Sequence, residues 1–183
     1  MKRAVCGLLL LVLTGCGSVS GEPDDMELVQ VLGIDGPGPI MLTAVSGPGG
    51  EVCKTNCLGK DFAEAREEIR WSGRGTALSL TGVSGIVVGA EVDLSAVLFS
   101  VLADNELGPS VMVWVTGGSA ADLLAECEDP MADLSLLILK GTVSPTAAQA
   151  LAAVLTDGMV RLPNLVEEDG RLVEQGSMTW RED

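Results

Sequence analysis

A regular apolar repeat between two short apolar runs restricts the fold of this chain more than any other feature. Five apolar residues after Asp93 recur at spacings of three and four, as in an amphipathic helix: Leu94, Val97, Leu98, Val101 and Leu102. Asp93 can cap the start of this helix, and Gly108-Pro109 prevents its continuation. The runs 86–88 and 111–115 on either side have the composition of buried strands. This order predicts a crossover unit whose two strands are parallel neighbours in one sheet.

Three more helices are expected. The first follows Asp61 as N-cap and places three apolar residues on one face: Phe62, Ala65 and Ile69. The second begins with Ser119 and runs to Cys127. The third begins at Ser144-Pro145, because proline suits the first helical position, and Gly158 ends it. Its inward-facing residues are expected to be Leu151, Val154 and Leu155.

Hairpins flank the crossover unit. Residues 27–34 and 40–46 are expected to pair around a glycine- and proline-rich turn, and Asp169-Gly170 signals a second hairpin near the end of the chain. Gly47 opens a loop that runs through Cys53 and Cys57, while the stretches 76–82 and 134–140 fit no single assignment. The sequence therefore predicts one mixed α/β domain over residues 27–183, a sheet with crossover helices and flanking hairpins.

The first sixteen residues resemble a bacterial lipoprotein signal. Lys2 and Arg3 precede an apolar run that is shorter than the roughly 20 residues needed to cross a bilayer, and Leu13-Thr14-Gly15-Cys16 closes it. We expect residues 1–15 to be a signal peptide, Cys16 to carry the lipid anchor, and residues 16–26 to form a lipidated spacer. A diacylated cysteine would hold the domain on the lipid bilayer.

Composition narrows the classes of function. The chain of 183 residues has a net charge of −15, and loss of Lys2 and Arg3 with the signal takes it to −17. Such acidity argues against nucleic acid as a partner and against electrostatic adhesion to anionic lipid. Histidine and tyrosine are both absent, which removes the commonest general base and the usual imidazole metal ligand. No enzyme activity, cofactor or metal is expected.

Few residues suggest chemistry of their own. Cys53 and Cys57 could close a small disulfide loop. A zinc site is disfavoured, because Cys127 is the only other cysteine after Cys16. Asp35 could be a metal or catalytic carboxylate, but a turn residue bonding the following backbone is favoured. Ser84 and Ser119 lack the flanking glycines of a nucleophile elbow, and the glycines at 82, 85 and 89 fit no nucleotide-binding loop.

The chain also resembles a known family, the C-subunit lipoproteins of bacterial spore germinant receptors (the GerC type), over their amino-terminal domain. The resemblance lies in the order of its segments: the Cys16 signal, 27–35, 62–65, 85–91, 104–107, 111–115 leading into 118–124, 162–163 and 170–176. Two features depart from the family. Ala103 precedes Asp104 where the family carries an arginine, and the family has further domains after this one.

The resemblance implies a non-enzymatic subunit of a nutrient receptor on the outer face of the spore inner membrane, acting in germination. Its implied partners are the membrane-embedded A and B subunits. An alternative is a solute-binding lipoprotein of a transporter, although such proteins usually place two domains around a cleft. A third is a small envelope hydrolase, for which the acidic runs 67–68 and 167–169 are candidates by composition alone.

The lipid anchor gives the first testable prediction. Changing Cys16→Ala should abolish incorporation of radiolabelled palmitate and move the protein out of the membrane fraction, because the thiol is the expected acylation site. Cys53→Ala, as the control, should retain both the label and the membrane association. Label that persists in the Cys16→Ala variant would contradict the assignment.

Overall fold

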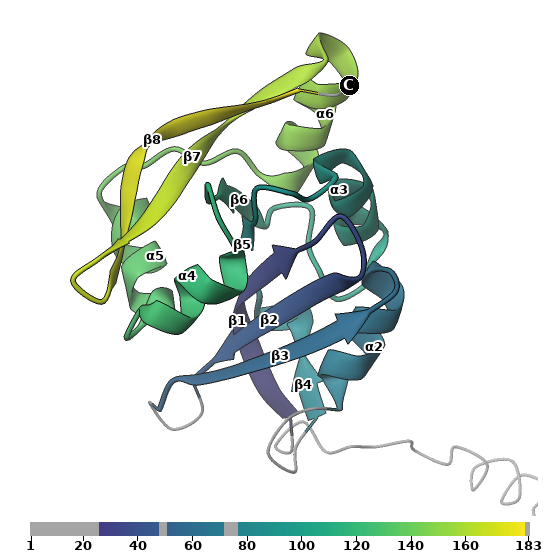
Figure 1. The fold of residues 1–183 in the computed structure, drawn as a ribbon, viewed down its shortest axis with the longest axis vertical. Helices are drawn as coiled ribbons and strands as arrows, with labels where there is room; N and C mark the ends of the chain where they lie inside the picture. Colours follow the sequence, from purple (N-terminus) through teal and green to yellow (C-terminus); the bar gives the residue numbers. More distant parts are fainter. Residues whose placement is uncertain (1–25, 48–50, 72–76, 182–183) are drawn as a thin grey trace, which may run out of the picture.

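The computed structural model describes residues 26–47, 51–71 and 77–181, and its centre is a sheet of seven consecutively paired strands with β4 attached to the start of β1 (Figure 1). The strands are β1 (Met26–Asp35), β2 (Ile40–Ser46), β3 (Cys53–Gly59), β4 (Ala77–Ser79), β5 (Gly85–Val88), β6 (Met112–Val115), β7 (Met159–Glu168) and β8 (Arg171–Arg181). The helices are α2 (Phe62–Arg70), α3 (Leu94–Ala103), α4 (Ala120–Glu126), α5 (Pro130–Leu139) and α6 (Ala147–Asp157), with a 3-10 turn at Leu80–Gly82.

The sheet confirms the predicted α/β class. Its strand order is β3-β2-β1-β5-β6-β7-β8. β1, β5, β6 and β7 run parallel, and β2, β3 and β8 pair antiparallel with their neighbours. Val87 of β5 lies opposite Trp114 of β6, so the crossover unit predicted around the 94–102 helix is present. Both predicted hairpins are confirmed, one as β1–β2 and the other as β7–β8.

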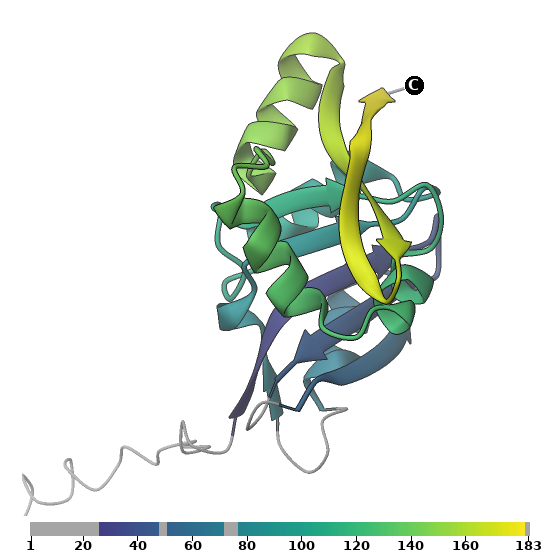
Figure 2. The same cartoon turned by 90° about the vertical axis from the view of Figure 1, so that its left-hand side faces the viewer.

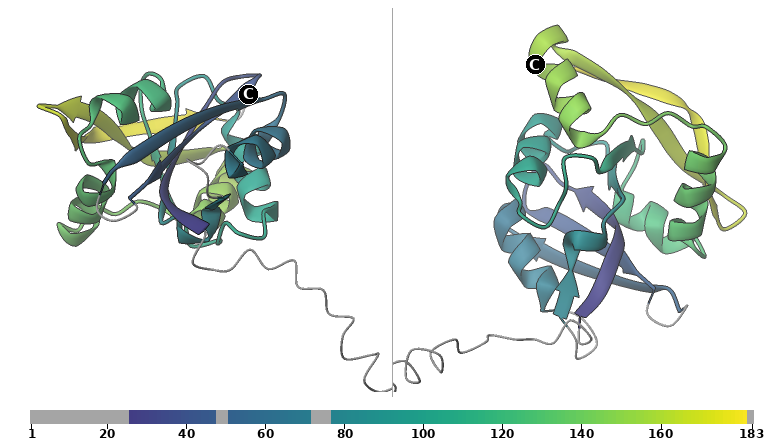
Figure 3. Two further views of the ribbon diagram at one scale, coloured as in Figure 1. Left: turned by 90° about the horizontal axis from the view of Figure 1, so that it is seen from below. Right: turned by 180° about the vertical axis from the view of Figure 1, so that it is seen from behind.

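Side chains alternate between two cores on the two faces of the sheet. Leu32 and Ile86 point into the core beneath α2, α3 and α6, whereas Val31, Val87 and Trp114 point into the core beneath α4 and α5. Figures 2 and 3 show the same three layers from the side, from below and from behind. Because the central strands are covered on both faces, they read in the sequence as continuous apolar runs.

Each described α-helix begins at a residue that caps it. The side chains of the five N-cap residues accept hydrogen bonds from the backbone N–H three residues ahead: Asp61, Asp93, Ser119, Asp129 and Thr146. Such bonds satisfy amide groups that the helix itself leaves without acceptors. Gly158 ends α6 in the left-handed conformation, at φ 66°, where glycine carries no steric penalty.

The structure corrects the predicted start and inner face of α6. The helix begins at Ala147, not at Ser144-Pro145, because Thr146 and Gln149 form a capping box while the residues before them lie extended along β6. Leu155 does not face inward. It is 59% exposed, because the buried face of α6 is formed by Ala147, Ala150, Leu151 and Val154.

The structure contradicts the loop predicted through Cys53 and Cys57, and it shows regular structure in the two stretches that the sequence left open. The segment through Cys53 and Cys57 is not a loop but strand β3, which pairs with β2 along its full length. Residues 134–140 belong mostly to α5, whose start signal, Asp129 followed by Pro130, lies ahead of the apolar run. Residues 77–82 form β4 and the short 3-10 turn.

The expected signal peptide, residues 1–15, and all of the expected spacer except Met26 lie outside the described residues. Within the described ranges, no helix combines the length and the apolar character that crossing a bilayer requires.

Gly59 gives a test of the packing between the sheet and α2. A Cβ at this position would overlap the backbone of Ala65 on α2, so Gly59→Ala should lower the free energy of unfolding by about 1–3 kcal/mol. Gly117→Ala is the matched control, because its Cβ would meet nothing within 4 Å, and its effect should stay within about 0.5 kcal/mol. Urea denaturation of the two variants checks this, and equal stabilities would show that the contact at Gly59 is not tight.

Candidate functional site

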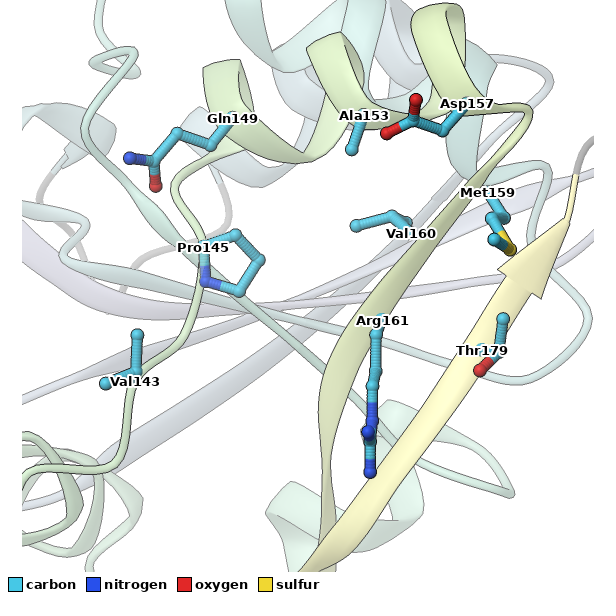
Figure 4. A pocket seen from close by; sticks show the side chains of 9 residues that line it. All are labelled: Val143, Pro145, Gln149, Ala153, Asp157, Met159, Val160, Arg161 and Thr179. Carbon is cyan, nitrogen blue, oxygen red and sulfur yellow. The ribbon is translucent and has the colours of Figure 1, made fainter.

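A groove of about 860 Å³ lies beside the first half of β7 (Figure 4). Its lining comes from the segment before α6, from one side of α6, and from the β7–β8 ribbon: Val143, Pro145, Gln149, Ala153, Asp157, Met159, Val160, Arg161 and Thr179. Its volume falls within the range of natural ligand and peptide sites, which is roughly 300–1,000 Å³.

The groove exists because β7 leaves the sheet. β7 pairs with β6 only at Val115 and Asn164, near the carboxyl end of β6. Ahead of that point the outer edge of β6 is taken by residues 144–147. Pro145 O accepts from Val113 N at 3.0 Å, and Ala147 N donates to Val111 O at 2.8 Å. This segment lies where β7 would otherwise pair, so it separates the two strands.

The groove is mainly apolar and is open to solvent. Val143 is 88% exposed and Met159 is 47% exposed. Asp157 and Arg161 supply its two charges. Within the described part of the chain neither forms an ion pair, and Arg161 uses its Nε–H to donate to Ser177 Oγ.

The β7–β8 ribbon, which forms one wall of the groove, is held at both of its ends. At its tip the buried carboxylate of Asp133 accepts from Leu172 N at 2.9 Å and from the Arg171 guanidinium at 3.0–3.1 Å. Glu128 N donates to Gly170 O at 2.7 Å. At the other end Gly158 alone joins the ribbon to α6. The wall is therefore tied to α5 at a point away from the groove and to α6 at the groove's own end, between Asp157 and Met159.

Asp35 has a structural role that the sequence did not reveal. It ends β1 and does not bond the following backbone. Its carboxylate accepts from Ala120 N at 2.7 Å and Ala121 N at 2.8 Å, and from the Ser119 hydroxyl at 3.2 Å. Asp35 thus satisfies the amino end of α4 across the carboxyl ends of the parallel strands, where open α/β sheets commonly bind ligands. Its partners lie about 85 residues away in the chain, so no local pattern could predict them.

A hollow of about 430 Å³ opens beside this carboxylate, lined among others by Met41, Glu91 and Gly118. The amide groups at the start of α4 are already bound by Asp35, which leaves no anion-binding amides free there. We therefore assign Asp35 to stability, and the groove beside β7 remains the candidate site.

The Asp104-to-Leu107 segment forms a partly buried polar network. Asp104 accepts from the backbone of Glu106 and Leu107, at 2.8 and 3.2 Å. Arg66 of α2 pairs with both Asp104 and Glu106 at 2.8 Å. Glu106 also accepts from Leu80 N at 2.8 Å. An arginine therefore does face Asp104, but it comes from α2 rather than from position 103. The network fixes the end of α3 to α2 and to the 3-10 turn.

The structure contradicts the disulfide considered for Cys53 and Cys57. Both residues lie on β3, four positions apart, so their Cα atoms are about 13 Å apart, whereas a disulfide needs less than about 7 Å. Cys53, Cys57 and Cys127 are all free thiols. Desolvation by burial, with a smaller contribution from Asp133, raises the pKa of Cys127 to about 11, which makes it a poor nucleophile. The expected anchor, Cys16, lies outside the described residues.

The remaining residues singled out by the sequence lie apart from one another. Ser84 donates to Gln30 O at 3.3 Å, and Ser119 caps α4. Glu67 accepts from the Trp71 indole, and Glu167 accepts from Gly170 N in the β7–β8 turn. The structure does not bring any of these together into one site.

Comparison with protein-family models, with curated proteins and with solved structures finds no match.

The Asp35 contact can be tested by mutation. Asp35→Ala should lower the free energy of unfolding by about 3 kcal/mol, because two buried amide groups of α4 lose their acceptor. Glu91→Ala, which changes an exposed carboxylate beside the same hollow, should change it by no more than about 0.5 kcal/mol. Denaturant unfolding of both variants measures the difference. Similar values would show that Asp35 is not a cap of α4.

Proposed function

We propose that this protein is a membrane-anchored lipoprotein subunit of a spore germinant receptor, which acts in germination by docking on the membrane-embedded A and B subunits. The observation that carries the proposal is the order of family-like segments along the chain, from the Cys16 signal to residues 170–176. No single segment identifies the family, so the proposal depends on the order and the spacing of all the segments together.

The positions of these segments in the fold support this reading. Residues 27–35 form most of β1, 62–65 begin α2, and 85–91 include β5. The segments 111–115 and 118–124 cover β6 and the start of α4, and 170–176 covers the start of β8. They fall on strands and helices of one sheet-centred domain, as a resemblance to a single domain requires.

The shape of the domain suits an anchored docking module. β1 starts at one end of the molecule, and α6 with the last residues of β8 lies at the other (Figures 1 and 2). Ten residues from Cys16 to Met26 can span at most about 35 Å, so a lipid on Cys16 would keep the domain close to the bilayer. The end carrying α6 would then face away from the lipid and toward the extramembrane parts of a partner.

Anchoring also lowers the affinity that docking requires. A lipid confines the domain to a thin layer beside integral membrane partners, which raises its effective concentration there. A modest interface, such as one groove and its rim, is then sufficient for a stable assembly. The acidic surface, with a net charge of −17 after signal removal, keeps the body of the domain off anionic lipid.

Genetics and purification test the proposal directly. Deleting the gene in a spore former should abolish or strongly slow germination in response to a nutrient, and a tagged wild-type chain should co-purify with an A and a B subunit from detergent extracts. The Cys16→Ala variant should restore little of the response, because it lacks the anchor. Unchanged germination together with no co-purifying A or B subunit would overturn the proposal.

A further inference from the structure

The groove beside β7 has an unsatisfied backbone edge along it. Residues 159–163 of β7 pair with β8 on one side, but on the side of the groove no described residue forms a backbone hydrogen bond with them before Asn164. Across the groove, Val143 likewise has no backbone partner in the described part of the chain. Exposed strand edges of this kind are templates for pairing with another chain.

The outer edge of β8 is less suited to pairing. The outer edge of β8 carries an irregularity where the register shifts between Pro163 and Leu165, with Gly176 at φ 72°. Such bulges twist an edge away from an incoming strand. The β7 edge differs because it borders a hollow of about 860 Å³ that has apolar side chains on both sides. Figure 4 shows Val143 and Pro145 across the gap from Val160 and Arg161.

We propose that this groove binds an extended segment of a partner polypeptide, added as a strand along residues 159–162 of β7. These four residues, which are followed by Pro163, where no N–H is available, offer about 13 Å of edge, enough for a short strand. Main-chain hydrogen bonds to β7 supply affinity, and alternate apolar side chains of the segment pack against Val143, Ala153 and Val160. The groove is then the surface by which the proposed receptor subunit docks on its partner. Only the identity of that partner rests on the proposed function.

The two unpaired charges in the groove define the partner segment further. Asp157 and Arg161 both line the groove, so the segment is expected to carry a cationic side chain opposite Asp157 and a carboxylate opposite Arg161. A second copy of this chain is a poorer occupant, because two bodies of net charge −17 repel each other. A small apolar molecule would satisfy the apolar lining but leave the strand edge unpaired.

A synthetic heptapeptide is the probe for this inference. Its sequence alternates valine and threonine, with lysine at one end and glutamate at the other, and both termini are blocked. Binding should slow amide hydrogen exchange in the 159–162 stretch of β7 by about tenfold or more, while β3 and the outer edge of β8 are unaffected. A peptide of the same sequence with N-methylated central amides should bind at least about tenfold more weakly, because it cannot donate to the strand edge.

A matched pair of variants locates the site. Val143 and Leu139 are both highly exposed, at 88% and 82%, but only Val143 lines the groove. Val143→Arg should weaken peptide binding by about tenfold or more through steric blocking, whereas Leu139→Arg should leave it unchanged. Thermal unfolding of both variants checks that neither has lost its fold.

The outcomes separate this inference from the proposed function. No peptide binding up to millimolar concentration, equal binding of the N-methylated peptide, or equal effects of the two variants would each overturn the strand addition. Co-purification of the A and B subunits with wild-type chain, undiminished in Val143→Arg, would overturn the groove as docking surface and leave the receptor function standing. Peptide binding, together with unchanged germination after gene deletion and no co-purification of A or B, would leave the groove as a peptide site and overturn the receptor function.

Discussion

The arrangement of the carboxyl-terminal half depends on backbone hydrogen bonds that residues 144–147 make to the outer edge of β6. A parallel α/β sheet would ordinarily continue with the next strand in this place. Here a short extended segment takes the position, and the following helix starts from it at Thr146. β7 can then reach β6 only at Asn164, so the β7–β8 ribbon diverges from the sheet. Because residues 144–147 take the place of β7 beside β6, the groove, the exposed edge of β7 and the exposed position of Val143 all arise together.

Much of the fold could be predicted from the sequence because its signals are local. The N-caps Asp61, Asp93 and Ser119 are read from residues within one turn of the helices they start, and Asp169-Gly170 identifies the last hairpin by its own backbone requirements. Parallel pairing of β5 with β6 follows from the length of the connection between them.

The sequence predictions that the structure contradicts share a different cause, which is contact with parts of the chain outside the local pattern. β3 has a polar sequence that propensity does not favour in a strand, and only pairing with β2 along its length makes it one. Pro145 would suit a first helical turn, but the edge of β6 holds it extended. Asp35 looked like a turn residue, since nothing nearby shows that α4 starts beside it. The groove could not be predicted at all, because it arises from a strand pairing that does not form.

The single-residue junction between α6 and β7 has a mechanical consequence. Gly158 is the sole link between the helical wall and the strand wall of the groove, and the far end of the strand wall is clamped to α5 through Asp133 and Arg171. The width of the opening therefore depends on three attachments of the strand wall: the turn at Gly158, the pairing with β6 at Asn164 and the contact of the ribbon tip with α5. Loosening the distant clamp would change that aperture without altering any residue that lines it.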